Sequence, residues 1–295
     1  MAGCGEAWRE PPPVEEAAFR RDHETWRAWR RADLTRSGGF LLLVGLYELA
    51  KGTTPFGADT SLSIAVPPGK APLLAGTLVR EGTRVTLQPA ARVRISVADS
   101  AAGNPPVTGP LALRTDHDSA GPTDVALGTL RLRIHQVGER VWLRVWDEDH
   151  PLRRTFAGAE SYPAQLPWRV AARFRSFRSP RHVRVADVSG GQQDYDVPGE
   201  LVFRVDGQER RLLPFAEPAD TALWILFGDS TNARETYGAG RYLYVSRPDS
   251  SGWTVIDFNR AYNPPCAFNA FATCPLPPRE NRLALAVRAG EKRYH

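Results

Sequence analysis

Residues 130–146 read Leu-Arg-Leu-Arg-Ile-His-Gln-Val-Gly-Glu-Arg-Val-Trp-Leu-Arg-Val-Trp, and this stretch decides the fold class. Apolar residues alternate with polar ones on both sides of Gly138 and Glu139, which is the pattern of half-buried β-strands. Because the two alternating runs are joined by a short turn that contains glycine, they predict an antiparallel hairpin.

The same period of two recurs along most of the chain. It appears in Val93–Val97, in Ala172–Arg181, where arginines face solvent, and in Leu201–Val205, which is followed by the turn residues Asp206 and Gly207. Short strands at this spacing are typical of sandwiches and barrels. We therefore expect an all-β protein with mainly antiparallel, sandwich-like or barrel-like sheets.

One helix is expected before the strands. The proline run at residues 11–13 suits a helix start, and Val14–Arg31 has an amphipathic pattern with Phe19, Trp26 and Trp29 near one face. We expect this face to pack on the body, and the alternative is a free arm that binds a partner.

The pattern divides the chain into three parts. Residues 1–35 form the helical segment, residues 36–150 a sandwich-like β unit, and residues 151–295 a C-terminal β unit. The boundary is placed at residues 150–168 because that stretch has little strand pattern.

Composition argues against two classes of partner. The net charge of +5 is modest and spread along the 295 residues, whereas nucleic-acid binding needs a concentrated basic face. Phe40–Leu49 is the longest apolar stretch, but it contains Glu48 and is half the ~20 residues that a membrane-spanning helix needs. We expect a protein that binds neither nucleic acid nor membranes, and composition leaves its oligomeric state open.

The N-terminus lacks the apolar core of a signal peptide, and the chain has three cysteines, Cys4, Cys266 and Cys274. A low, odd cysteine count fits a reducing compartment. We expect a cytoplasmic protein with free thiols, while pairing of Cys266 with Cys274 stays open. The almost exclusive use of arginine as the basic residue favours a GC-rich bacterial genome.

The densest polar sequence runs from Asp229 to Asn281, and we call it the polar segment. The planar guanidinium of an arginine can donate two parallel hydrogen bonds to a carboxylate or phosphate, and the tyrosines and asparagines of the segment could orient a bound group. This composition predicts a cleft for a small anionic ligand or peptide, without a cofactor. The expected ligand-binding residues are Arg234, Tyr237, Arg241, Asn259, Arg260, Tyr262 and Asn263.

Two alternatives to this binding site remain. The polar segment could be an enzyme site, most plausibly of a hydrolase or transferase, that uses Glu235, Asp257 or Cys266 as base or nucleophile. It could also be structural, in which case Arg241 should be clamped by Glu235, Asp257 or Glu280. No metal site is expected, since the acidic run at residues 147–150 is explained equally well by a turn.

Within this segment the sequence resembles a known family. The blocks ETYGAGRYL, DFNRAYNPPCAF and CPLPPRENRL are similar to those of the bacterial and archaeal domain-of-unknown-function 1684 family, and LLVGLYEL, VPPGKAPLLAGTL and VTGPLALRTD also fit it. The resemblance covers most of residues 26–293 and implies no activity. Residues 56–78 are also similar in layout to the start of a forkhead-associated sandwich, although Ala58 stands where that fold has an arginine that reads phosphothreonine.

Overall fold

The structure is a computed structural model that describes residues 8–99, 101–216 and 220–294. Cys4 lies outside these residues. The chain folds into two compact units: unit 1 contains residues 1–31 and 157–295, and unit 2 contains residues 32–156. Most of the helical segment that the sequence set apart therefore belongs with the C-terminal β unit.

Unit 2 holds two five-stranded sheets, in the orders β1-β10-β9-β8-β6 and β3-β2-β4-β5-β7. The pairs are antiparallel except β2 with β3, and one hydrophobic core takes side chains from both sheets. The unit's elements are η1 (Phe40–Leu42), β1 (Leu43–Glu48), β2 (Gly52–Gly57), β3 (Ile64–Ala65), β4 (Gly76–Glu81), β5 (Arg84–Pro89), β6 (Ser96–Val97), β7 (Leu111–Leu113), β8 (Val125–Leu127), β9 (Leu130–Val137), β10 (Arg140–Asp147) and α2 (Leu152–Thr155).

The hairpin that decided the fold class is confirmed. Strands β9 and β10 pair antiparallel along their full length, and Gly138 takes the positive φ of 56° that the turn requires. The strand expected over Val93–Val97 is wrong in extent, because only Ser96–Val97 is extended and paired. Arg92 just before it has a φ of 64°, so the backbone turns there instead of continuing a strand.

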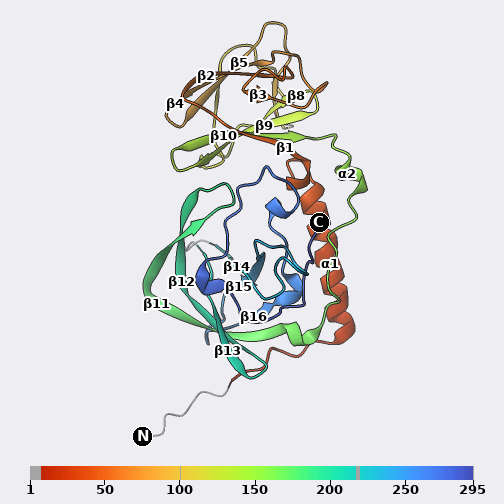
Figure 1. Ribbon diagram of the computed structural model, residues 1–295, viewed down its shortest axis with the longest axis vertical. Coiled ribbons are helices and arrows are strands. Elements are labelled where there is room, and N and C mark those ends of the chain that lie inside the picture. Colours follow the sequence, from red (N-terminus) through yellow and green to blue (C-terminus); the bar gives the residue numbers. More distant parts are fainter. Residues whose placement is uncertain (1–7, 100, 217–219, 295) are drawn as a thin grey trace. The chain divides into compact units, whose positions relative to one another are not determined.

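Unit 1 is built around a four-stranded sheet, β13-β12-β11-β16, and a separate two-stranded ribbon, β14-β15. Figure 1 shows β11 and β12 as a long curved hairpin around the ribbon. The unit's elements are α1 (Glu16–Thr35), which continues past residue 31, η2 (Leu166–Trp168), β11 (Arg169–Ala186), β12 (Gln192–Val205), β13 (Gln208–Leu212), β14 (Ala222–Phe227), β15 (Arg241–Ser246), β16 (Trp253–Asp257), η3 (Phe258–Arg260), η4 (Pro265–Ala267) and η5 (Arg279–Asn281).

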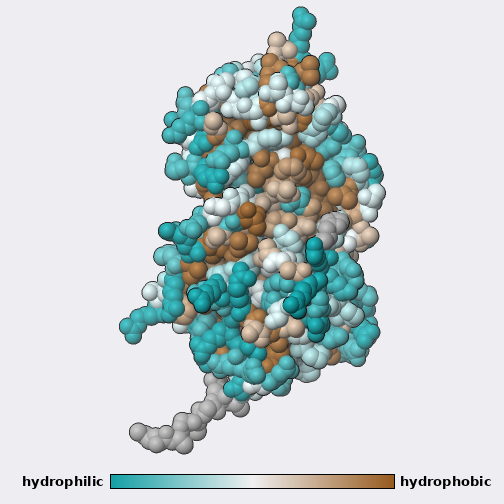
Figure 2. Space-filling view, in the orientation of Figure 1, coloured by the Kyte–Doolittle hydropathy of each residue, from teal (hydrophilic) through white to brown (hydrophobic). Residues whose placement is uncertain are grey.

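Two local predictions in unit 1 are confirmed. The turn between β12 and β13 uses Asp206 and Gly207, both at positive φ, and Ala172–Arg181 lies within β11 with its later arginines exposed. Hydrophilic side chains predominate on the face of unit 1 that Figure 2 shows, whereas the apolar side chains of the sheet and the ribbon form one core. The chain is thus mainly β, mainly antiparallel, with one long helix. Among the described residues, no helix is long and apolar enough to cross a membrane.

The packed face of α1 differs from the one predicted. Phe19 and His23 are buried as the periodicity requires, but Trp29 is 59% exposed and Arg30 is only 8% exposed. At 100° per residue, position 30 lies within about 20° of position 19, while position 29 lies roughly 80° away. The prediction that Trp29 packs on the body was wrong, because the position of a residue around the helix axis decides its burial here, and not its hydrophobicity.

The assigned face of α1 can be tested by truncating one side chain that lies on it, Phe19, and one that lies off it, Trp29. Phe19→Ala should cost ~3–5 kcal/mol of unfolding free energy because it leaves a cavity, and Trp29→Ala should change it by at most about 0.5 kcal/mol because its ring is mostly in water. Urea melts of the two variants measure both values. Equal losses would contradict the assigned face.

Candidate functional site

Arg241, at the start of β15, is the largest fully buried side chain in the described structure. One terminal nitrogen lies 2.8 Å from Oδ2 of Asp229 and 2.8 Å from the carbonyl oxygen of Val287. The other donates to the carbonyl oxygens of Ala289 and Glu291. Both members of the ion pair have side chains with 0% exposure, so Arg241 cannot meet a ligand from solvent.

The carboxylate of Asp229 is satisfied on its other oxygen as well. Its Oδ1 accepts hydrogen bonds from the backbone and hydroxyl of Thr231, at 2.8 and 2.6 Å, and from the backbone of Val287 at 3.3 Å. A buried ion pair is tolerated when further hydrogen bonds satisfy its partners. Both terminal nitrogens of Arg241 and both carboxylate oxygens of Asp229 are bonded, whereas Nε of Arg241 is buried without a hydrogen-bond partner. The clamp expected for a structural Arg241 is therefore present, but its carboxylate is Asp229 and not Glu235, Asp257 or Glu280.

The segment that receives Arg241 is irregular, and it lies too close to its neighbours to admit a side chain at one point. Gly290 has a φ of 77°, and a Cβ there would lie 2.4 Å from the carbonyl oxygen of Ala261. Because this segment forms few β-ladder hydrogen bonds, its carbonyl groups depend on Arg241 for hydrogen-bond donors.

Two asparagines expected to bind a ligand are also internal. Asn259 exchanges hydrogen bonds with the backbone of Gln165, at 2.9 and 3.0 Å, and it is fully buried. Asn263 donates from Nδ2 to the carbonyl oxygen of Lys292 at 2.8 Å and is fully buried as well. Both side chains connect backbone segments that are distant in sequence.

Arg260 and Tyr262 contact helix α1. The Arg260 guanidinium pairs with Asp22, and the Tyr262 ring lies 4.7 Å from the guanidinium carbon of Arg30. Arg30 also donates to the carbonyl oxygen of Asn263 at 2.8 Å and pairs with Glu291 at 3.4 Å. Sequence reasoning missed Arg30 and Glu291, since nothing in their local sequence distinguishes them from surface charges. It also did not identify Asp229, the first residue of the polar segment, as the partner of Arg241.

Arg234 and Tyr237 have access to solvent, as Arg260 and Tyr262 do in part. The Arg234 side chain is exposed and has no partner among the described residues. Tyr237 is half-buried, and its hydroxyl donates to the carbonyl oxygen of Cys266 at 3.1 Å. Arg234 is thus the one guanidinium of the expected set that is exposed and unpaired in the described structure.

Glu235, the first catalytic candidate, is bridged to two side chains. Arg288 donates to its two carboxylate oxygens, each at 2.9 Å, and the hydroxyl of Tyr162 donates at 2.9 Å. The hydrogen bonds from Arg288, followed by that from Tyr162, lower the pKa of Glu235 to about 2. A carboxylate held in its ionised form is a weak base near neutral pH.

Asp257 and Cys266, the other candidates, have local structural contacts. Asp257 accepts from the backbone of Asn259 at 3.1 Å and from its side chain at 2.8 Å, which caps η3. The Cys266 backbone donates to Sγ of Cys274 at 3.1 Å. Both thiols are free, and contact with Cys274 lowers the pKa of Cys266 while that of Cys274 is raised.

Carboxylates of the acidic run at residues 147–150 form ion pairs with basic side chains of the same chain. Asp147 pairs with Lys70 at 3.1 Å, and Asp149 pairs with Arg154 at 2.8 Å. In the parts of the chain that the structure describes, no group of three or more histidine, cysteine or acidic side chains is arranged to hold a metal.

A pocket of about 340 Å³ lies beside the ribbon of unit 1. Its lining includes Tyr195, Trp224 and Tyr244, together with Asp196 and Asp220. Trp224 and Tyr244 are opposite each other on β14 and β15, with rings nearly parallel at 22° and centroids 6.4 Å apart. The Tyr195 ring centroid is 5.9 Å from that of Trp224, so three aromatic side chains from three strands meet here.

The stack of aromatic rings extends inward from the pocket. The planes of Tyr244 and Tyr262 differ by 15° with centroids 6.0 Å apart, and the guanidinium of Arg30 lies over the Tyr262 ring. Tyr244 itself is 58% exposed, which leaves much of its surface open to a ligand.

The structural reading of Arg241 makes a stability prediction. Arg241→Ala should cost ~3–5 kcal/mol of unfolding free energy because Asp229 is left buried without its partner, whereas Arg234→Ala should stay within about 0.5 kcal/mol. Denaturant melts compare the two variants. A harmless Arg241→Ala would show that the buried pair is dispensable.

Glu235 makes a pH prediction. Its pKa is depressed from 4.5 to about 2 in the folded state. The stability that the ionised carboxylate contributes is therefore complete above about pH 4.5 and is lost as the pH falls through about 2. Carboxyl-carbon NMR should therefore find Glu235 ionised at pH 4, and Arg288→Ala should raise the pKa toward 4.5. A midpoint near neutrality in the unmodified protein would instead restore Glu235 as an acid–base candidate.

The region that matches a known family lies almost entirely in unit 1. The model of the family described as protein of unknown function DUF1684 matches residues 154–292, which contain the polar segment and the aromatic pocket but not the earlier blocks that resemble the family. A solution NMR structure of an uncharacterized protein of Haloarcula marismortui is 34% identical, over 48% of this chain and 80% of that one, with a TM-score of 0.41.

A comparison with curated proteins found no match. The forkhead-associated layout of residues 56–78 has no support in these comparisons and stays a prediction. The signature blocks and the family match agree, and the chain belongs to the DUF1684 family of proteins of unknown function.

Proposed function

We propose that unit 1 binds a small organic cation in the aromatic pocket. The observation that carries this proposal is the meeting of Tyr195, Trp224 and Tyr244 around a hollow to which Asp196 and Asp220 also contribute. The face of an aromatic ring attracts a cation through its quadrupole, and nearby carboxylates add to the attraction.

The interior of the same stack supports this chemistry. The Arg30 guanidinium lies over the Tyr262 ring at 4.7 Å, at the inner end of the stack that Tyr244 and Trp224 continue toward the pocket. The fold thus already holds one cation against the innermost ring of the stack, that of Tyr262. A ligand cation that lies over Tyr244 or Trp224 would make the same cation–π interaction with a partly exposed ring.

The size of the pocket favours a small ligand. Its volume of about 340 Å³ lies at the lower end of the ~300–1,000 Å³ range of ligand pockets. Asp196 already contacts Nδ1 of His182 at 2.5 Å, so the aromatic rings are the groups we expect to contribute most to affinity.

The anionic ligand expected from the sequence is less well supported. Of its three arginines, Arg241 is buried and Arg260 is paired, so Arg234 alone would have to bind the anion. The enzyme alternative stays a prediction as well, and it is weakened by the bridging of Glu235 and by the capping role of Asp257.

Choline and its uncharged isostere 3,3-dimethylbutan-1-ol provide a direct test, with tryptophan fluorescence as one readout and calorimetry as the other. Choline should bind and the isostere should bind roughly tenfold or more weakly, since only the former has a cation–π term. Tyr244→Ala should weaken choline by a similar factor.

Trp29→Ala is the matched control, because Trp29 is 59% exposed and Tyr244 58% exposed within the same unit. It should leave choline affinity unchanged. Equal binding of the isostere, or equal loss in both variants, would contradict a cation site at this pocket.

A further inference from the structure

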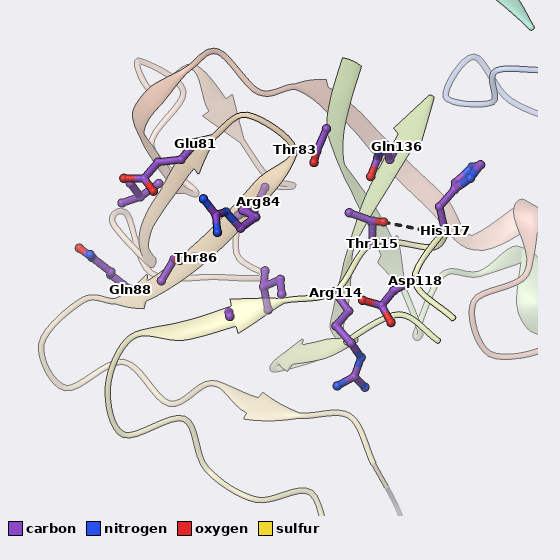
Figure 3. A pocket seen from close by; sticks show the side chains of 14 residues that line it. Glu81, Thr83, Arg84, Thr86, Gln88, Arg114, Thr115, His117, Asp118 and Gln136 are labelled. Carbon is purple, nitrogen blue, oxygen red and sulfur yellow. Dashed lines mark hydrogen bonds between the residues drawn. The ribbon is translucent and has the colours of Figure 1, made fainter. Parts of the chain in front are cut away.

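A hollow of about 830 Å³ in unit 2 is lined by side chains of both charges, including Glu81, Arg84, Arg114 and Asp118. Figure 3 shows the guanidinium groups of Arg84 and Arg114 pointing away from each other, and Nε of Arg114 donates to the carbonyl oxygen of Gly121 at 2.8 Å. These charges therefore do not converge on one ligand. In unit 1, by contrast, two reactive side chains meet directly.

The two thiols of unit 1, those of Cys266 and Cys274, are in contact. The backbone N–H of Cys266 donates to Sγ of Cys274 at 3.1 Å, and the two thiols share a further hydrogen bond. The Cα atom of Cys266 is joined to that nitrogen by a bond of about 1.46 Å, so it lies at most about 4.6 Å from the Cys274 sulfur. Disulfides form between residues whose Cα atoms are ~4.4–6.8 Å apart. The two sulfur atoms are therefore near enough to bond after small side-chain rotations.

The surroundings of the two thiols differ. Cys266 is partly exposed, whereas Cys274 is 5% exposed. The hydrogen bond from the Cys274 thiol lowers the pKa of Cys266, and the same bond together with burial raises the pKa of Cys274. Because the thiolate is the reactive form of cysteine, a reagent from solvent reacts first with Cys266. Cys274 then lies beside the modified sulfur, as the resolving thiol of a redox sensor does.

The chain around the cysteines is held at both ends and is irregular between them. The hydroxyl of Tyr237 donates to the carbonyl oxygen of Cys266 at 3.1 Å, and that of Tyr242 donates to the carbonyl oxygen of Pro275 at 2.6 Å. Residues 268–274 belong to no helix or strand. The fold thus keeps the two thiols together, while the backbone between them can adjust to a new bond.

We propose that Cys266 and Cys274 form a reversible intramolecular disulfide when the protein meets a peroxide. The Cys266 thiolate attacks one peroxide oxygen and the O–O bond breaks, which leaves a sulfenic acid at Cys266 and, after protonation, water or an alcohol. The sulfur of Cys274 attacks the sulfenic sulfur, the S–O bond breaks, and the departing hydroxide takes the Cys274 proton as water. The two sulfurs together lose two electrons, and the peroxide gains them. This site does not depend on the cation pocket.

Oxidation of the reduced, unmodified protein with one equivalent of hydrogen peroxide tests the proposal. Trypsin releases both cysteines in one peptide, residues 261–279, because that stretch has no internal lysine or arginine. After denaturation and alkylation, mass spectrometry should find this peptide lighter by two hydrogens and without alkyl groups. Treatment with dithiothreitol should restore both thiols. A peptide that is alkylated at both cysteines after peroxide treatment would overturn the proposal.

Substitutions separate the roles of the cysteines. Cys274→Ser should stop the reaction at a sulfenic acid on Cys266, which dimedone traps, and Cys266→Ser should leave Cys274 roughly tenfold or more slower to oxidise. Cys4→Ser is the control, and it should leave the yield of the disulfide unchanged. A disulfide that includes Cys4, or a sulfinic acid at Cys266 in place of the disulfide, would contradict the pairing. The unmodified protein decides the proposal even if a variant does not fold.

Discussion

The buried ion pair between Arg241 and Asp229 is the interaction on which unit 1 depends. Taking two charges out of water costs several kcal/mol per ion, and this is offset only when both have hydrogen-bond partners. Here the two terminal nitrogens of the guanidinium donate to Asp229 and to the carbonyl groups of Val287, Ala289 and Glu291, and the carboxylate accepts from Thr231. Only Nε of the guanidinium lacks a hydrogen-bond partner. The pair thereby fastens an irregular segment to the ribbon.

This constraint explains why the polar segment looks like a functional site. It is rich in arginine, asparagine and tyrosine because irregular backbone has few ladder bonds, and buried carbonyl and amide groups must be paired by side chains. Asn259 and Asn263 have the same role as Arg241 at other points. Polar density in a sequence therefore indicates either ligand binding or internal support, and burial separates the two.

The candidate ligand site of unit 1 lies instead on strands. Aromatic residues of β12, β14 and β15 line it together with Asp196 and Asp220. Because the rings are carried by paired strands, they are positioned without adding strain to the core.

The strands were predictable wherever alternation and a turn residue coincide, as at Gly138 and at Asp206 with Gly207. Prediction failed where one backbone angle overrode the pattern, as at Arg92, and where helical phase placed Arg30 inside and Trp29 outside. The candidate sites were beyond sequence reasoning for another reason. Tyr195 meets Trp224 and Tyr244 only through strand order, and the burial of Arg241 depends on a segment nearly fifty residues later in the chain.

Native-state hydrogen exchange of the unmodified protein tests the role of the buried pair most directly. The backbone amides of Val287 and Glu291 donate to Asp229 and to Ala261 within a segment that has almost no regular structure. If Arg241 fastens this segment to the core, both amides should exchange only through global unfolding, with the same free energy and denaturant dependence as the amides of β14 and β15. Rapid exchange through local opening, independent of denaturant, would contradict the account.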